Sequence, residues 1–236
     1  IITAEVPAKA VILLGQHIGA PAKPVVAKGD VVKVGTRIAE PAGFVSAAIH
    51  SSVSGKVAKI DTIVDASGYA KPAIFIDVEG DEWEETIDRS KTLVKECELS
   101  SEEIVKKIAD AGIVGLGGAC FPTQVKLCPP PSFKAECVII NAVECEPYIT
   151  ADYRSVMDDV KDLVTGAKIM KKMAEAKTVY ICIKESHPDL IEKVKSVLTD
   201  AAGVEVRPVP DVYPMGWERV LVREVLHKEY GGLPAE

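Results

Sequence analysis

The sequence lacks the features that mark several well-known classes of protein. It has no apolar run near the ~20 residues needed to cross a bilayer, and no basic segment leading into an apolar signal core. It also lacks a basic face, because its net charge is −7 and the charges are spread without long runs. No nucleic acid is therefore expected as a partner. We expect a globular protein of the cytoplasm, with peripheral docking on the inner face of the cell membrane as an option.

Paired cysteines are missing as well. The six cysteines are Cys97, Cys120, Cys128, Cys137, Cys145 and Cys182, and no two of them form the CxxC pair typical of zinc or cluster ligands. In a reducing compartment such thiols usually pack as small apolar side chains. Cys120 and Cys145 are of more interest, because each lies inside one of the motifs described below. The four histidines lie outside these motifs, and no Ser–His–Asp triad is found.

The chain is long enough, at 236 residues with 47% hydrophobic residues, to form two modest domains. Residues 1–90 are rich in valine, isoleucine and small residues and are punctuated by glycines, a pattern typical of short strands joined by tight turns. Residues 91–236 alternate strands with helices, which favours a parallel sheet. The acidic stretch 80–97 is expected to connect the two domains. The fold class is thus α/β plus β.

The helices and strands of the second domain can be located from its sequence. A capping box at Ser100 and Glu103 begins a helix over residues 100–111, which Gly112 ends. Strands are expected over 137–141, 178–183 and 204–209, and further helices over 154–173, 188–198 (capped by Ser186) and 217–226. In such sheets the functional site lies at the carboxyl ends of the strands.

One motif is a glycine-rich loop, GLGGACFPTQVKL, at residues 115–127. Gly115, Gly117 and Gly118 allow the backbone to approach an anionic group, and the amides that follow can point at a phosphate. The dinucleotide fingerprint would need a strand before the glycines and a helix directly after them. Here a helix precedes the glycines and Pro122 interrupts the exit, so the motif is a different one. In isolation such a loop can also be a simple tight turn.

The other motif, VIINAVECEPYITADYR, places Asn141, Glu144 and Glu146 directly after a buried strand. Neighbouring carboxylates repel unless they are solvated or hydrogen-bonded, so their clustering indicates a use. No histidine or third carboxylate stands at ligand spacing, and no metal site is expected. No side chain is assigned as a catalytic acid or base.

The first domain contains KGDVVKVGTRIAE and SSVSGKVAKI, which look like the two quasi-repeats of a biotinyl- or lipoyl-type hammerhead, a barrel-sandwich hybrid. Carriers of this type hold a modifiable lysine on a hairpin. Aligning the second repeat places Phe44 at that position. We therefore expect no covalently attached biotin or lipoyl group.

The combination of GxGGAxFPTxxKL, NAxExEPY, YPMGWE and GGLP resembles the RnfC family, which belongs to the Rnf ion-translocating ferredoxin:NAD oxidoreductases. That family is related to the NADH- and FMN-binding flavoprotein of complex I. Residues 15–57 resemble the leading domain of RnfC proteins, so the resemblance covers essentially the whole chain. It implies a barrel-sandwich hybrid over 1–90, followed by a Rossmann-like parallel-sheet FMN/NAD(H)-binding domain over 91–236 that is truncated at its carboxyl end.

The resemblance implies FMN and NAD(H) as cofactors. It places the glycine loop along FMN, Lys126 near the flavin ring and nicotinamide, and Phe121 against the nucleotide, with ordinary core packing as the alternative for Phe121. It also implies that Asn141 and Glu144 hydrogen-bond the flavin and that Glu146 faces the nicotinamide carboxamide.

Later in the chain, Tyr213, Gly216 and Glu218 match the YxxGEE segment of complex I, with Glu218 near the NADH adenosine. Trp217 replaces the first glutamate of that segment, and Val143 stands where an aspartate is usual. Trp217 could stack on a ring or pack in the core.

The implied activity is that of an NADH dehydrogenase-type flavoprotein, with hydride exchange between nicotinamide and FMN and electrons relayed to or from iron–sulfur clusters outside this chain. The expected partners are NADH or NAD and the other subunits of an electron-transfer complex. Alternatives are a soluble relative serving proline reductase or a cobalamin reductase, and a non-catalytic scaffold. Because family members continue beyond GGLPAE into a further flavin-binding segment, a β-rich domain and a two-cluster region, this stretch alone is expected to be inactive.

Overall fold

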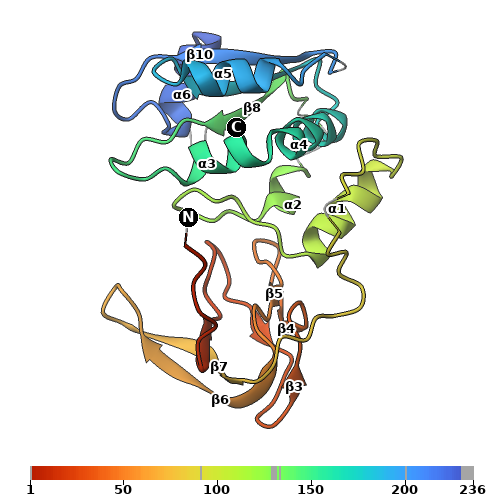
Figure 1. Cartoon of the computed structure of the whole chain (residues 1–236), viewed down its shortest axis with the longest axis vertical. Helices are drawn as coiled ribbons and strands as arrows, with labels where there is room; N and C mark the ends of the chain where they lie inside the picture. The colour runs from red at the N-terminus through yellow and green to blue at the C-terminus, as the bar shows by residue number, and fades with distance from the viewer. Residues whose placement is uncertain (1, 91, 129–131, 133, 200, 230–236) are drawn as a thin grey trace. The chain divides into compact units, whose positions relative to one another are not determined.

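The computed structural model describes residues 2–90, 92–128, 132, 134–199 and 201–229 (Figure 1). The chain forms two compact units, one of residues 1–91 with 100–129 and the other of residues 92–99 with 130–236. Each unit has its own hydrophobic core. The helix and glycine loop that follow residue 100 therefore group with the strands of the first unit.

Two small antiparallel sheets make up most of the first unit. One has the strand order β1-β7-β6-β3 and the other β2-β4-β5. The bounds are β1 (Lys9–Leu13), β2 (Lys23–Pro24), β3 (Val31–Val32), β4 (Arg37–Glu40), β5 (Ile49–His50), β6 (Gly55–Val64) and β7 (Ala70–Val78). The long hairpin of β6 and β7 is the curled orange ribbon of Figure 1. Branched side chains from both sheets fill the core, where Val32, Ile38, Val57, Ile74 and Ile76 are at most 1% exposed.

Helix α1 (Ser101–Asp110) begins with the expected capping box. The Ser100 hydroxyl accepts from the Glu103 N–H at 3.3 Å, and the Glu103 carboxylate accepts from the Ser100 N–H at 2.8 Å. Such a cap stabilises a helix by about 1 kcal/mol. Gly112 ends the helix with φ of +66°, as expected. After Pro122, α2 (Thr123–Lys126) forms a single turn.

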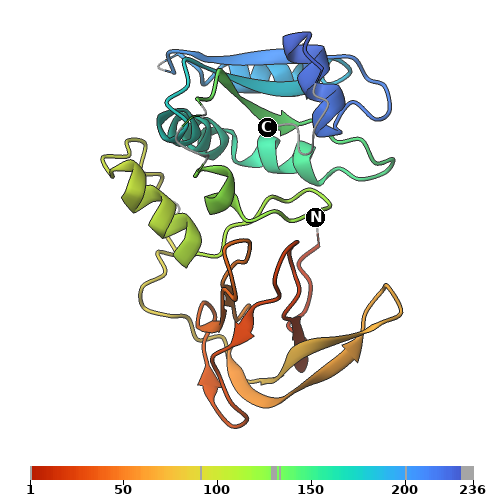
Figure 2. The ribbon, with the colours of Figure 1, turned by 180° about the vertical axis from the view of Figure 1, so that it is seen from behind.

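The second unit is a three-layer α/β fold around a parallel sheet of order β10-β9-β8 (Figure 2). Its strands are β8 (Cys137–Ala142), β9 (Thr178–Lys184) and β10 (Val204–Val209), and its helices are α3 (Ala151–Asp158), α4 (Val160–Met173), α5 (Pro188–Lys195) and α6 (Glu218–Leu226). Successive side chains of a strand point to opposite faces of the sheet, and helices cover both faces of β9. Val179, Ile181 and Ile183 pack towards α3, α4 and α5, whereas Tyr180 and Cys182 pack towards α6.

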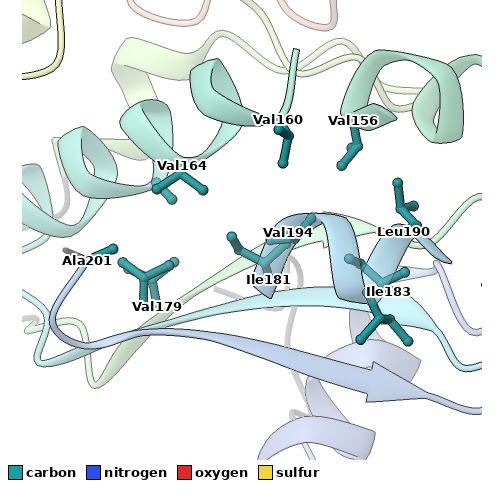
Figure 3. Packing of buried hydrophobic residues seen from close by; sticks show 12 residues of the cluster. Val156, Val160, Val164, Val179, Ile181, Ile183, Leu190, Val194 and Ala201 are labelled. Atoms are coloured by element: carbon teal, nitrogen blue, oxygen red, sulfur yellow. The ribbon is translucent and has the colours of Figure 1, made fainter. Parts of the chain in front are cut away.

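Figure 3 shows the larger of these two contacts, in which Val156, Val160 and Val164 from α3 and α4 meet Ile181 and Ile183 of β9. All five side chains are at most 6% exposed. The parallel sheet expected from the strand–helix alternation is confirmed, and this packing buries one face of its central strand.

Two expectations about helices were wrong. The helix expected over 154–173 is two helices, α3 and α4, which break at Asp159 with φ of −124° and ψ of 42°. The apolar spacing of Val156, Val160 and Val164 runs through the break, so periodicity alone could not reveal it. The cap expected at Ser186 is also absent: α5 begins after His187 without a side-chain cap, and the Ser186 hydroxyl bonds the Asp211 carboxylate instead. That helix ends at Lys195, three residues earlier than expected.

No helix in the part of the chain that the structure describes is long and apolar enough to pass through a membrane.

Candidate functional site

The glycine loop is a closed hairpin of the first unit. Val114 and Pro122 form an antiparallel bridge, and the Gly115 N–H donates to the Phe121 carbonyl at 2.8 Å. The Cys120 N–H donates to the Gly117 carbonyl at 3.0 Å, and Cys120 adopts a left-handed φ of +44° to complete the turn. These bonds hold the base of the loop while its tip stays in solvent.

The tip of this loop offers hydrogen-bond donors. Within the described residues, the backbone N–H groups of 116–119 donate to no protein acceptor. A Cβ added to Gly117 or to Gly118 would meet nothing within 4 Å, so the backbone can be approached closely from outside. Unpaired amides at an open glycine turn form a concavity suited to an anionic group.

A cation lies beside the loop. Lys126, the last residue of α2, holds its ammonium so close to Gly115 that a Cβ there would lie 2.9 Å from Nζ. The same Nζ is 6.0 Å from the centroid of the Phe121 ring. Lys126 is exposed and forms no salt bridge with any described residue. The structure thus brings the three glycines, Phe121 and Lys126 together, as expected.

The polar residues after β8 belong to the second unit, and several of them are engaged by the protein itself. Asn141 donates from Nδ2 to the Gly216 carbonyl at 2.8 Å and accepts at Oδ1 from the Val143 N–H at 3.1 Å. The Gly216 N–H in turn lies 2.7 Å from the Cys145 sulfur. A Cβ at Gly216 would come within 2.2 Å of the Val143 carbonyl oxygen. These contacts join the end of β8 to the segment that carries Tyr213 and Glu218.

Glu144 has a structural partner as well. Its carboxylate accepts from the N–H groups of Asp152 and Tyr153, at 3.1 and 3.4 Å, and so caps the start of α3. Burial, followed by repulsion from Glu144, raises the pKa of Asp152. Glu146, by contrast, is exposed, and its carboxylate contacts no polar group of the described chain. Of the clustered carboxylates, Glu146 is the one left available to a ligand.

The segment before α6 presents aromatic side chains to solvent. Tyr213 is 73% and Trp217 51% exposed, and Glu218 opens the first turn of α6. Core packing of Trp217, one of the two options left open by the sequence, is therefore wrong. The GGLP motif at residues 231–234 lies outside the described residues.

A charged pair at the ends of two neighbouring strands was not expected from the sequence. Lys184 ends β9 and is 14% exposed at its side chain, and its ammonium lies 2.8 Å from the Asp211 carboxylate just after β10. Hydrogen bonds from Lys184 and Ser186 lower the pKa of Asp211. Only the parallel register, which aligns the two strand ends, brings these residues together.

Burial raises the pKa of the Cys182 thiol to about 12, so this cysteine is an inert part of the core. Among the residues with described positions, no group of three His, Cys, Asp or Glu side chains is arranged to hold a metal ion.

Comparison with known protein families matches residues 1–81 to the RnfC barrel sandwich hybrid domain and residues 108–236 to the Nuo51 FMN-binding domain. The chain is 43% identical to the C subunit of the proton-translocating ferredoxin:NAD(+) oxidoreductase complex of Clostridium ljungdahlii, in an alignment of 99% of this chain and 51% of that protein. It is 38% identical to the C subunit of the Na(+)-translocating ferredoxin:NAD(+) oxidoreductase complex of Acetobacterium woodii, over 98% of this chain and 52% of that protein.

The C subunit of an ion-translocating oxidoreductase complex from Rhodobacter capsulatus is 37% identical, over 96% of this chain and 44% of its own length. The chain thus spans about half the length of the curated relatives it matches. A chain of an NAD+-reducing [NiFe]-hydrogenase aligns with 52% of this chain and 24% of its own length, at 23% identity and a TM-score of 0.47. That likeness is too weak to indicate a shared function.

The family match covers the glycine loop, Lys126 and the loop after β8. In the structure these are an open amide turn, an exposed lysine beside it, and a strand end that is hydrogen-bonded to Gly216. With its barrel-sandwich hybrid and its parallel-sheet unit, the chain belongs to the family of the Nuo51 FMN-binding domain and is homologous over nearly its whole length to the RnfC proteins of Rnf complexes.

Proposed function

We propose that this chain is the FMN- and NAD(H)-binding part of an electron-transfer flavoprotein of the RnfC type. The observation that carries the proposal is the open glycine loop, whose amides at 116–119 have no acceptor among the described residues, beside Lys126, which has no salt-bridge partner among them. The relatives are named as subunits of ferredoxin:NAD(+) oxidoreductase complexes, which supports the same chemistry here.

The donor set fits FMN. Backbone amides of 116–119 suit its anionic phosphate or the polar edge of its ring, and the glycines leave room for close approach. When bound, FMN supplies hydride exchange with nicotinamide. Lys126 places a fixed positive charge next to the loop, and such a charge stabilises the negative charge that a flavin gains on reduction. Phe121, 6.0 Å from that ammonium, gives the site an apolar wall.

The second unit supplies the contacts proposed for the nicotinamide nucleotide. Glu146, exposed and without a partner in the described chain, can accept a hydrogen bond from the carboxamide N–H₂ group. Glu218 and Tyr213 stand on the segment held by Asn141 and are proposed to contact the nucleotide, with Glu218 near the adenosine. Asn141 and Glu144, proposed as flavin ligands, also hold this frame together through their bonds within the protein.

The proposed partners are NADH or NAD, the other subunits of an electron-transfer complex, and iron–sulfur clusters outside these 236 residues. We also propose peripheral attachment to the cytoplasmic face of a membrane complex, because the relatives are named as subunits of ion-translocating complexes. A scaffold without redox chemistry would need neither Lys126 nor the amides of 116–119, which have no acceptor or salt-bridge partner in the described part of the chain.

Glu146 provides the test of the nucleotide assignment. In the FMN-loaded, full-length protein, Glu146→Gln should raise the KM for NADH about tenfold or more in an NADH-to-ferricyanide assay, because a carboxylate is a stronger acceptor than an amide. The flavin content should stay at the wild-type level.

The matched control is Glu192→Gln, which removes an exposed carboxylate from α5 and should leave NADH oxidation unchanged. An unchanged KM in the Glu146 variant with intact flavin would remove this residue from the site. A protein that binds no FMN at all would instead support the scaffold alternative.

A further inference from the structure

We infer that the barrel-sandwich part of the first unit positions the glycine loop and Lys126, and that Gln124 is the positioning residue that links them. The inference rests on the function proposed for Lys126. It assigns a role to a hammerhead whose expected attachment site carries Phe44 in place of a lysine.

Gln124 ties the single turn of α2 to the strands. Its Nε2 donates to the Ser46 carbonyl at 2.8 Å, across 78 residues of sequence. Its Oε1 is buried and has no partner among the described residues, so one hydrogen bond orients the whole amide. Because α2 has four residues and no side-chain cap, it has little intrinsic stability and depends on such outside contacts. Lys126 is the last residue of the same turn.

Ser46, the acceptor of this bond, is itself fixed. It is 0% exposed, its hydroxyl donates to the Ala20 carbonyl at 2.8 Å, and the same hydroxyl accepts from the Ala42 N–H at 3.0 Å. The segment 41–48 is the one in which related carriers hold their modified lysine, and Phe44 at its tip is 75% exposed. In this chain the buried side of the segment supports α2.

A second contact reaches the glycine loop itself. The Ile18 N–H donates to the Ala119 carbonyl at 3.0 Å, at the tip of the loop. The preceding residue, His17, is anchored at both ring nitrogens, which lie 3.1 Å from the Ala47 N–H nitrogen and 3.0 Å from the Ile18 carbonyl oxygen. The tip is thus held by a segment that is fixed to the same support as Gln124.

The residues that lead into the loop rest on the sheet as well. A Cβ at Gly112 would lie 2.2 Å from the Ala48 carbonyl oxygen, which shows how closely the two backbones approach. The Arg37 guanidinium donates to the carbonyl and to the carboxylate of Asp110, at 3.1 and 3.2 Å. Residues 110, 112, 119 and 124 are therefore all held from the barrel-sandwich side. Such support matters because a fixed charge stabilises a reduced cofactor only if it is held in place beforehand.

The test compares Gln124→Leu with Lys126→Met in the FMN-loaded, full-length protein. Leucine keeps the approximate size of glutamine but cannot donate to Ser46. We expect the ratio of reduced to oxidised flavin at a fixed ambient potential to fall about tenfold, which equals a midpoint potential lower by about 30 mV for a two-electron couple. Lys126→Met should shift the potential in the same direction. If Gln124 acts through Lys126, adding Gln124→Leu to Lys126→Met should cause no further shift.

Gln16→Leu is the matched control, because Gln16 also donates to a backbone carbonyl but does so locally, to Leu13 at 3.0 Å. It should leave the potential unchanged. Thermal unfolding of the FMN-free proteins checks that the variants are folded, and Gln124→Met provides a second variant with a flexible apolar chain. Hydrogen exchange at the bonded N–H groups of Gly115 and Cys120 in the FMN-free protein should speed up in both Gln124 variants and not in the Gln16 variant.

The outcomes separate the inference from the function on which it rests. A shift with Lys126→Met and none with either Gln124 variant would overturn the positioning role and leave the proposed function intact. A shift from Gln124→Leu that persists in the Lys126→Met background would also overturn it, because the effect would not pass through the lysine. If Lys126→Met changed neither FMN binding nor the potential, the role proposed for Lys126 itself would fail.

Discussion

The glycine loop of residues 114–122 and the acidic loop of residues 141–149 differ in how their polar groups are hydrogen-bonded. In the glycine loop the amides of 116–119 have no acceptor among the described residues, and the loop is held from outside by contacts at Ala119 and Gln124. The acidic loop engages its own polar groups, since Asn141 bonds to Gly216 and Glu144 caps a helix. Both motifs suggest ligand binding in the sequence. In the structure the glycine loop presents hydrogen-bond donors, whereas the acidic loop uses Asn141 and Glu144 for hydrogen bonds within the protein.

This difference follows from the type of group that each loop offers. A backbone amide stays available if a glycine-rich turn gives it no internal acceptor, and the loop then needs support from elsewhere. A side-chain amide or carboxylate finds nearby backbone partners readily, because it can rotate towards them. The comparison predicts that substitutions in the acidic loop mainly lower the free energy of unfolding, whereas substitutions in the glycine loop mainly weaken FMN binding.

The largest effect is expected from Gly216→Ala. The new methyl group would lie 2.2 Å from the Val143 carbonyl oxygen and 2.7 Å from the Cys145 sulfur, so backbone must move. We expect the free energy of unfolding to fall by about 3 kcal/mol in urea titrations. Gly166→Ala in α4 is the control: its Cβ would meet nothing within 4 Å, and alanine should stabilise the helix by about 0.5–1 kcal/mol. Equal stability of the two variants would show that the contact between β8 and Gly216 is not tight.

A somewhat smaller loss is expected from Asn141→Leu. It leaves the Gly216 carbonyl and the Val143 N–H without their partner, which should cost about 2 kcal/mol. Asn141→Asp can still accept from Val143 but cannot donate to Gly216, and it should lose about half as much. If Asn141→Leu kept full stability and lost only FMN, Asn141 would be a ligand and not part of the frame.

The glycine loop should behave in the opposite way. Gly117→Ala places a methyl group in open space and should change the free energy of unfolding by no more than about 0.5 kcal/mol. The same methyl group should weaken FMN binding about tenfold, or about 1.4 kcal/mol, because it blocks close approach to the amides. Fluorescence titration of FMN and urea unfolding measure the two effects separately. A stable variant with wild-type affinity would show that FMN does not approach this glycine.

The smallest effect concerns pH and the start of α3. Burial and the neighbouring Glu144 raise the pKa of Asp152, so its ionised form is less favourable in the folded state than in the unfolded state. Asp152→Asn should therefore raise the free energy of unfolding at neutral pH, by less than about 1 kcal/mol because the residue is only partly buried and solvent screens its charge.

The upward direction of the pKa shift determines how the stability gained by Asp152→Asn depends on pH. As the pH falls through the raised folded-state pKa, wild-type Asp152 becomes protonated, its penalty disappears, and the two proteins should converge in acid. Melting temperatures of both proteins from pH 4 to pH 8 would check this. A gain that grew towards low pH would contradict the assigned cause.

Features that depend on neighbours within a few residues could be predicted from the amino-acid order. They include the capping box at Ser100 and Glu103, the turn at Gly112 and the open glycine loop, because caps and backbone dihedrals are local properties. The absence of a modifiable lysine at Phe44 can likewise be read directly from the chain.

The hydrogen-bond partners of the polar side chains, in contrast, depend on long-range packing. The expected long helix is broken at Asp159, and the Glu144 carboxylate accepts a hydrogen bond at the start of α3. Packing also pairs Asn141 with Gly216 and Gln124 with Ser46, over 75 and 78 residues of sequence. Hydrogen bonds across such separations depend on how strands and loops pack, and apolar periodicity carries no information about which distant carbonyl a side chain will meet.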